Sequence, residues 1–138
     1  MYQQKSNKII KCPAEYGLSL FSGKWKLRIF CIINDRKNIR YSDLRSELPD
    51  ISDPVLSSAL KELIRDELIV RERFNEMPPR TTYRLSERGE SAVPILQALC
   101  RWASSIYSDG KNELAPQCSR CREDGNAAPE STDSDEGK

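Results

Sequence analysis

Residues 41–85 read YSDLRSELPDISDPVLSSALKELIRDELIVRERFNEMPPRTTYRL and carry the clearest structural pattern in the chain. The spacing of the first leucines predicts a short helix with Ser42 as its N-cap. A sharp turn follows, and a second, amphipathic helix is expected over residues 52–66. The alternating residues 68–74 and 80–85 then predict a two-stranded hairpin.

This order of elements is typical of a winged helix-turn-helix, an α+β fold that inserts its second helix into the major groove of DNA. The second helix would bury its leucines and turn a polar face outward, and the basic hairpin would form the wing. We predict groove contacts from Ser52, Pro54, Val55, Ser57, Ser58 and Lys61. Backbone or minor-groove contacts are expected from Lys24, Arg40, Arg71, Arg73 and Arg80.

Each of these residues also has a plainer interpretation. The polar helix face is otherwise an ordinary solvated surface, and Lys24 and Arg40 fit plain surface positions equally well. The wing arginines alternate with Glu72 and Glu76, so some of them could serve only in ion pairs. A helix-turn-helix followed by a hairpin favours DNA contact over these alternatives.

The composition excludes most classes of enzyme. The 138 residues contain no His, which removes imidazole acid–base catalysis, Ser-His-Asp triads and zinc sites that need His. No glycine-rich phosphate-binding motif is present, and the single Gly23-Lys24 pair is not a nucleotide site. We therefore predict a protein that is not an enzyme and that uses no cofactor or metal.

Charge divides the chain into a basic body and an acidic tail. Residues 1–108 hold 18 Lys and Arg against 13 Asp and Glu, and residues 109–138 hold 4 against 8. The resulting net charges of +5 and −4 suit a polyanion-binding domain with a solvated end. We expect a basic arm over residues 1–11, one domain over residues 12–108, and a disordered tail after it.

Nothing in the sequence points to export or membrane insertion. The first residues, MYQQKSNK, are polar, and no apolar segment of a signal peptide follows them. No apolar run approaches the roughly 20 residues of a membrane-spanning helix. We therefore expect a soluble, cytoplasmic protein that does not contact a membrane.

Further helices are expected on either side of the central stretch. Residues 13–22 and 25–34 predict two of them, and the second is apolar almost all round, as expected of the central core helix. The last helix, over residues 87–107, is capped by Ser86 and is either kinked by Pro94 or begins there. Its apolar side chains exceed what a small core can cover, which favours a homodimer. The predicted interface comprises Tyr16, Leu20, Leu96, Leu99, Trp102, Ala103 and Ile106.

Cys12 has the most distinctive side-chain chemistry in the chain. It is expected at a helix N-terminus beside Lys11, and both features lower the pKa of a thiol. A thiolate there would react with oxidants or electrophiles, although unreactive cysteines are common. Cys118 and Cys121 form a single C-x-x-C in the tail, which cannot close a four-ligand zinc site by itself, and we assign the pair no role.

Two segments read CPAEYGLSLFSGKWKLRIF and LPDISDPVLSSALKELIRDELIVRERFNEMPPRTTYRLSERGESAVPILQALCRW. Their Cys-Pro entry, G-K-W, L-P-x-I-S turn, L-K-E-L, P-P-R wing and L-x-x-L-C-x-W end resemble, in order and spacing, the HxlR family of bacterial winged-helix regulators. That family is related to the MarR regulators. The resemblance covers residues 12–106 and implies a dimer built from the first and last helices, and an operator in or near a promoter. It also implies, as in several members, control by a small reactive compound or by redox state, with the position of Cys12 as the sensor in some.

The chain departs from the family on the exposed face of the second helix. Many members carry Lys, Arg or Gln there, whereas this sequence has Asp53, Pro54, Ser58 and Ala59. Direct readout would then rest on serine hydroxyls, on Lys61, and on contact of Val55 with thymine methyl groups.

We predict a homodimeric, sequence-specific DNA-binding transcriptional regulator with a palindromic operator. Two alternatives stay open. One is a thiol-redox or metal-binding protein that uses Cys12, Cys118 and Cys121. The other is a winged-helix protein-interaction module that does not bind DNA.

Overall fold

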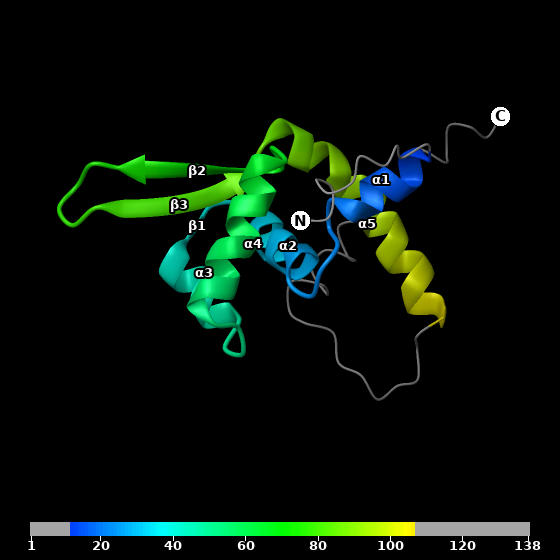
Figure 1. Cartoon of the computed structure of the whole chain (residues 1–138), viewed down its shortest axis with the longest axis horizontal. Helices are drawn as coiled ribbons and strands as arrows, with labels where there is room; N and C mark the ends of the chain where they lie inside the picture. Colours follow the sequence, from blue (N-terminus) through cyan, green and yellow to red (C-terminus); the bar gives the residue numbers. More distant parts are fainter. Residues whose placement is uncertain (1–11, 107–138) are drawn as a thin grey trace, which may run out of the picture.

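The computed structural model describes residues 12–106. These residues form α1 (Pro13–Ser19), α2 (Lys26–Arg36), β1 (Ile39–Arg40), α3 (Tyr41–Glu47), α4 (Asp53–Arg65), β2 (Ile69–Phe74), β3 (Arg80–Leu85) and α5 (Glu87–Ile106). The hairpin of β2 and β3 extends away from the helices as a long arm, and α1 and α5 lie at the opposite end of the domain (Figure 1). This arrangement confirms the predicted α+β winged helix-turn-helix.

The wing is part of a three-stranded antiparallel sheet of order β1-β3-β2. β2 and β3 pair along their whole length, from Ile69 opposite Leu85 to Phe74 opposite Arg80. β1 adds two residues on the other edge of β3. Ile69 is buried where β2 begins, and farther along the strand exposed Arg71 and Arg73 alternate with half-buried Glu72 and Phe74. Both predicted wing strands are confirmed.

α2 forms the centre of the core, as its sequence predicts. Ile29, Phe30, Ile32 and Ile33 of this helix are at most 1% exposed. The leucines that pack around it from α3 and α4 are Leu44, Leu56, Leu60 and Leu63. Burial of one such side chain stabilises the fold by about 1.5–3 kcal/mol. Since α2 contacts both α3 and α4, this packing orients the helix-turn-helix.

The beginning of α3 differs from the prediction. The helix starts at Tyr41 with Arg40 as its N-cap residue, so Ser42 lies inside the first turn and is not the cap. The reason is the preceding strand. Ile39 and Arg40 pair with β3, and the chain turns into the helix at the very next residue.

The end of α1 also differs from the prediction. The helix ends at Ser19, whereas the sequence predicts an end at Ser22. Beyond Ser19 the backbone hydrogen bonds tighten to a three-residue spacing, as in the bond from the Phe21 N–H to the Leu18 carbonyl. Gly23, with a φ of +105°, then turns the chain toward α2.

α5 is anchored at its beginning by the turn between α4 and β2. Ser86 is the cap that the sequence predicts, because its Oγ accepts from the Gly89 N–H at 3.0 Å and donates to the Glu67 carbonyl at 2.6 Å. A methyl group on Gly89 would lie 2.1 Å from the carbonyl oxygen of Leu68. Because α5 begins at Glu87, Pro94 lies inside the helix and does not begin it. Neither α5 nor any other helix of residues 12–106 is both long and apolar enough to cross a membrane.

Candidate nucleic-acid interface

α4 presents a polar, solvent-exposed face at the side of the domain that also carries the wing. Ser52 caps the helix as predicted, since its Oγ accepts a hydrogen bond from the Val55 N–H at 3.4 Å. The exposed residues among the predicted groove contacts are Ser52, Pro54, Val55, Ser58 and Lys61. The sequence suggested that Ala59 also lies on this face, and this is wrong. Ala59 is buried with Leu56 and Leu60 on the side of the core.

The acid at the start of α4 is paired inside the helix-turn-helix. The Oδ1 atom of Asp53 accepts one hydrogen bond from Arg45 Nε at 2.8 Å and another from the Tyr41 hydroxyl at 3.1 Å. The bond from Arg45, followed by that from Tyr41, lowers the pKa of the Asp53 carboxyl below its usual value of 3.8. At neutral pH the carboxylate is therefore ionised and matched by a guanidinium, although its side chain is 67% exposed.

Tyr41 and Arg45 each make a second contact near the turn. Burial raises the pKa of the Tyr41 phenol, a hydrogen bond with Ser57 lowers it, and Asp53 raises it. The phenol therefore stays protonated at neutral pH and can donate. Ser57 is half-buried, whereas its neighbour Ser58 is exposed. Arg45 Nη1 also donates to the carbonyl of Leu48 at 3.2 Å, beside the turn.

Of the three wing arginines that the sequence predicts as DNA contacts, two point to solvent and one folds back on the hairpin. Arg71 and Arg73 are exposed on β2. The guanidinium of Arg80 lies 4.2 Å from the ring centroid of Phe74, and its Nη2 donates to Glu76 at 3.1 Å. The ion pairing with Glu76 that the sequence suggested is thus made by Arg80.

A hollow of about 470 Å³ separates the wing loop from the start of α3. Its lining residues are Arg40, Tyr41, Ser42, Glu76, Pro78, Pro79, Arg80 and Thr81. Arg40 is exposed at its edge, where a phosphate group could reach it. On the hairpin itself, Glu72 pairs with Arg84 of the opposite strand at 3.2 Å, so neither side chain is aimed at a ligand.

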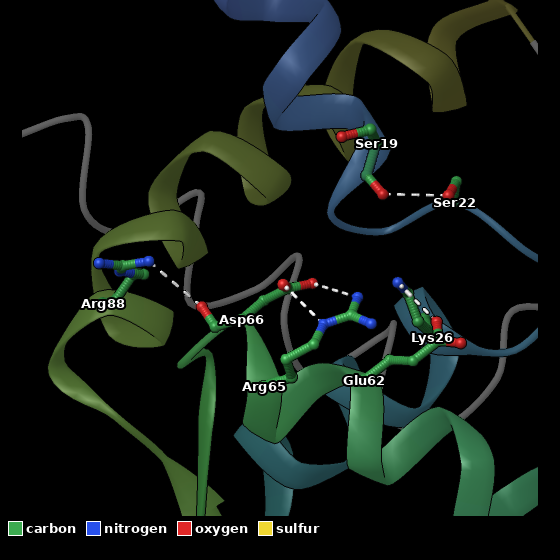
Figure 2. Close-up of polar contacts among 7 residues, drawn as sticks. All are labelled: Ser19, Ser22, Lys26, Glu62, Arg65, Asp66 and Arg88. Atoms are coloured by element: carbon green, nitrogen blue, oxygen red, sulfur yellow. Dashed lines mark hydrogen bonds and ion pairs between the residues drawn. The ribbon is translucent and has the colours of Figure 1, made fainter. Parts of the chain in front are cut away.

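A second hollow, of about 300 Å³, lies between α4 and the beginning of α2. Lys24 is exposed at its edge, with Nζ 5.1 Å from the ring centroid of Trp25. An ion pair of Lys26 Nζ with Glu62 Oε1, 3.1 Å long, joins the two helices beside the hollow (Figure 2). Only 7% of the Lys26 side chain is exposed, so the pair is largely withdrawn from water.

Sequence reasoning missed three of these polar residues: Tyr41, Arg45 and Lys26. A signal for Arg45 was present, because an acid at the start of the predicted recognition helix would need a cation beside it to bind DNA, and Arg45 precedes Asp53 across the turn. Lys26 is the first residue of α2, next to the apolar core positions of that helix, and Glu62 lies at the margin of the apolar face of α4. Such isolated charges at packed faces are usually paired.

α1 and α5 leave apolar side chains uncovered by the described chain. Of the predicted interface residues, Tyr16, Leu99, Trp102 and Ile106 are exposed and Ala103 is half-buried. Leu20 and Leu96, by contrast, pack against the chain's own core. Ile95, which is not among the predicted interface residues, is 68% exposed. We call the exposed set at helical spacing on α5 the α5 stripe; it consists of Ile95, Leu99, Trp102 and Ile106.

Cys12 is exposed and is the N-cap residue of α1, the position that the sequence predicts. Cys31 and Cys100 are half-buried. The predicted arm and tail, with Lys11, Cys118 and Cys121, lie outside the described residues. Among the described residues, no group of three or more Cys, Asp or Glu side chains could hold a metal ion.

Comparison with known proteins places this geometry in a family. The family model for the HxlR-like helix-turn-helix matches residues 20–111. An HTH-type transcriptional regulator of Methanothermobacter thermautotrophicus is 39% identical over 107 residues, which cover 76% of this chain and 81% of the relative. Both the family and this relative are transcriptional regulators, not enzymes.

Solved structures with the same architecture include a MarR-family transcriptional regulator from Porphyromonas gingivalis W83. It is 35% identical, has a TM-score of 0.63, and matches 73% of this chain and 98% of its own. The redox regulator HypR in its oxidized form is 30% identical with a TM-score of 0.63, matching 75% of this chain and 100% of its own.

Proposed function

The chain belongs to the HxlR-like helix-turn-helix family of transcriptional regulators, and from this membership we propose that it binds an operator in double-stranded DNA as a homodimer. The observation that carries the proposal is the exposed face of α4, a capped helix that turns Val55, Ser58 and Lys61 outward. A helix presented in this way fits the major groove, where each base pair shows a distinct pattern of donors and acceptors. Binding to an operator in or near a promoter would control transcription of the adjacent genes. A bacterial-type regulator of this kind acts in the cytoplasm.

Sequence readout and general affinity come from different residues. Ser58 and Lys61 offer hydrogen bonds to base edges, and Val55 offers an apolar contact to a thymine methyl group. Arg71 and Arg73 on the wing supply charge to the phosphate backbone, which strengthens binding to any sequence. Arg80 contributes less, since its guanidinium is held by Phe74 and Glu76.

The dimer is supported by the α5 stripe. Its members are 37–68% exposed, an unusual amount of apolar surface for one helix of a small domain. A two-fold arrangement would cover the stripe and would set two copies of α4 on a palindromic operator.

Regulation by oxidants or reactive electrophiles through Cys12 is the second element of the proposal. It is supported by the exposure of this residue and by similarity to HypR, which is described as a redox regulator. Cys12 caps α1 at the end of the domain that also carries α5, so modification of its sulfur would act on the dimer rather than on α4 directly.

The test is fluorescence anisotropy of the full-length protein on duplexes tiled across the DNA upstream of its own gene. A shuffled duplex of the same composition serves as the reference, and each titration is run at two salt concentrations. Selective binding to one duplex is expected. Equal affinity for all duplexes, or none, would contradict the proposal and favour a protein-interaction module.

Four variants then test the division of roles on the selected duplex. Arg73→Ala is expected to weaken binding to every sequence and to lower the salt slope by about 1. Lys61→Ala and Ser58→Ala are expected to change sequence preference instead, by about 1–3 kcal/mol per contact. Cys12→Ser is expected to remove any effect of a mild oxidant. The same loss on selected and shuffled DNA for the first three variants would contradict the assignment.

A further inference from the structure

We propose that Arg45 and Tyr41 are positioning residues that hold Asp53 and cancel its charge, so that the start of α4 approaches DNA without repelling it. The proposal rests on the DNA-binding function proposed above and adds two residues of α3 that act through a third residue. We call Tyr41, Arg45 and Asp53 the α4-start cluster.

The cluster reduces electrostatic repulsion between Asp53 and the phosphates of DNA. Asp53 is the first residue of α4, and two-thirds of its side chain is open to solvent. A recognition helix contacts bases through its N-terminal residues, which brings this carboxylate near the phosphates. Duplex DNA carries one negative charge about every 1.7 Å along its axis, so an unpaired carboxylate there would weaken binding to every sequence.

The geometry shows how the charge is cancelled. Arg45 Nε and the Tyr41 hydroxyl both reach the same oxygen of Asp53, at 2.8 Å and 3.1 Å. The guanidinium of Arg45 is itself held in place, because Nη1 donates to the carbonyl of Leu48 at 3.2 Å. An arginine with two such bonds is directed at its carboxylate rather than outward at a phosphate. The start of α4 thus keeps a favourable acid at its positive end while adding no net charge to the surface.

Tyr41 has a second role, because its phenol donates a hydrogen bond to Asp53 and lies near Ser57, whose hydroxyl lowers the pKa of the phenol. These two residues lie one helical turn apart on the same face of α4, directly beside the exposed Ser58. Since Tyr41 belongs to α3, its hydrogen bond to Asp53 links α3 to the reading face of α4 beside Ser57. We therefore expect Arg45 to govern affinity for all DNA and Tyr41 to govern the preference among sequences.

The test is a charge-rescue experiment on the full-length protein. Dissociation constants are measured by anisotropy for wild type, Arg45→Ala, Asp53→Asn and the double variant, on the selected and the shuffled duplex. Arg45→Ala leaves one uncancelled negative charge and is expected to weaken binding to both duplexes about tenfold. The double variant again has no net charge, and its affinity is expected to return to within about threefold of wild type.

A double variant as weak as Arg45→Ala would overturn the proposal, because Arg45 would then act on DNA or on the fold without Asp53. Arg45→Gln, with and without Asp53→Asn, gives the same comparison if the alanine variant does not fold. The control is the exposed pair of Arg88 Nη2 with Glu67 Oε1, 3.3 Å long, which joins α5 to the turn after α4. Arg88→Ala is expected to change affinity less than about twofold, with or without Glu67→Gln.

Tyr41→Phe removes the hydrogen bond to Asp53, and the hydroxyl near Ser57, without changing any charge. We expect its affinity for the shuffled duplex to stay within about twofold, and the ratio between the two duplexes to fall about threefold. An equal loss on both duplexes would assign Tyr41 a structural role only. Wild type that binds neither duplex would overturn the proposed function and this proposal together, whereas wild-type binding without rescue would overturn this proposal alone.

Discussion

The two ends of the domain treat their exposed side chains in opposite ways. At the start of α4, the charge of Asp53 is matched within the chain by Arg45 and Tyr41. On α5, Trp102 and Ile106 are 64% and 66% exposed, and the described chain offers them no cover. Figure 1 shows these regions on different sides of α2, with the wing beside one and α1 beside the other.

The difference distinguishes polar groups, which one chain can satisfy by itself, from an apolar stripe, which needs a second molecule to cover it. A polar group is satisfied by one or two well-placed partners, which a neighbouring helix can provide. An apolar stripe is stabilised only by removing its area from water. A domain of this size buries too small a fraction of its surface to cover every apolar side chain by itself. The charge at the start of α4 is thus satisfied within the chain, whereas the apolar stripe on α5 is not covered by residues 12–106.

The largest effect is expected where α5 joins the rest of the domain. Gly89→Ala forces a methyl group to 2.1 Å from the carbonyl oxygen of Leu68, a backbone atom that cannot turn aside. We expect the free energy of unfolding to fall by about 3 kcal/mol, measured by urea denaturation. Gly17→Ala is the matched control, because nothing lies within 4 Å of its added methyl group. It is expected to be neutral or to stabilise by up to about 1 kcal/mol, and equal losses in the two variants would contradict a tight joint.

Leu99→Glu would test whether the α5 stripe is covered by a second copy. An unpaired carboxylate buried in the interface is expected to weaken self-association at least about a hundredfold. Sedimentation over a series of protein concentrations measures the dissociation constant of the dimer. Met77→Glu, at a wing residue that is 91% exposed, is the control for a lost apolar residue elsewhere. A dimer that survives Leu99→Glu would place the interface on another surface.

The ion pair between α2 and α4 gives a smaller effect on stability. Lys26→Met leaves Glu62 without its partner, at an expected cost of about 2 kcal/mol in the free energy of unfolding. This is less than the roughly 3–5 kcal/mol for a fully buried pair, because Glu62 is 26% exposed. Addition of Glu62→Leu should recover most of the loss. A double variant no more stable than the single one would show that Lys26 matters for packing and not for charge.

The smallest effect is a pH dependence at the start of α4. Because the folded protein lowers the pKa of Asp53 below 3.8, the stabilisation from Arg45 and Tyr41 is complete above that value and is lost as pH falls through the lowered pKa. The free energy of unfolding of wild type minus that of Asp53→Asn should therefore stay constant above the unfolded value of 3.8 and decline as pH falls below it. A difference that does not change with pH would mean that Asp53 is not held in the folded state.

Local patterns predicted the elements well. The cap at Ser52, the acid and proline after it, and leucines at helical spacing identified α4, because all of them act within one or two turns. The strands of the wing were predictable for the same reason, since their alternation and the proline-containing loop are short-range signals. The start of α3 was not, because the pairing of β1 with β3 sets it and that contact spans more than forty residues of sequence.

Contacts between elements explain the remaining differences. Arg45 and Lys26 find their acids only when α3 and α2 lie at particular angles to α4, which helical periodicity does not contain. Likewise, Leu96 and Leu99 are both apolar residues of α5, but Leu96 packs on the core while Leu99 is exposed. The sequence indicates that α5 has more apolar surface than one core can use, and only the packed structure shows which residues are in excess.

Amide hydrogen exchange of the full-length protein, free and bound to its selected duplex, compares the two ends most directly. We expect slower exchange on DNA binding in α4 and the wing, and no change along the α5 stripe. Protection confined to α5, with α4 exchanging as it does in the free protein, would contradict the claim that α4 is the surface that reads DNA.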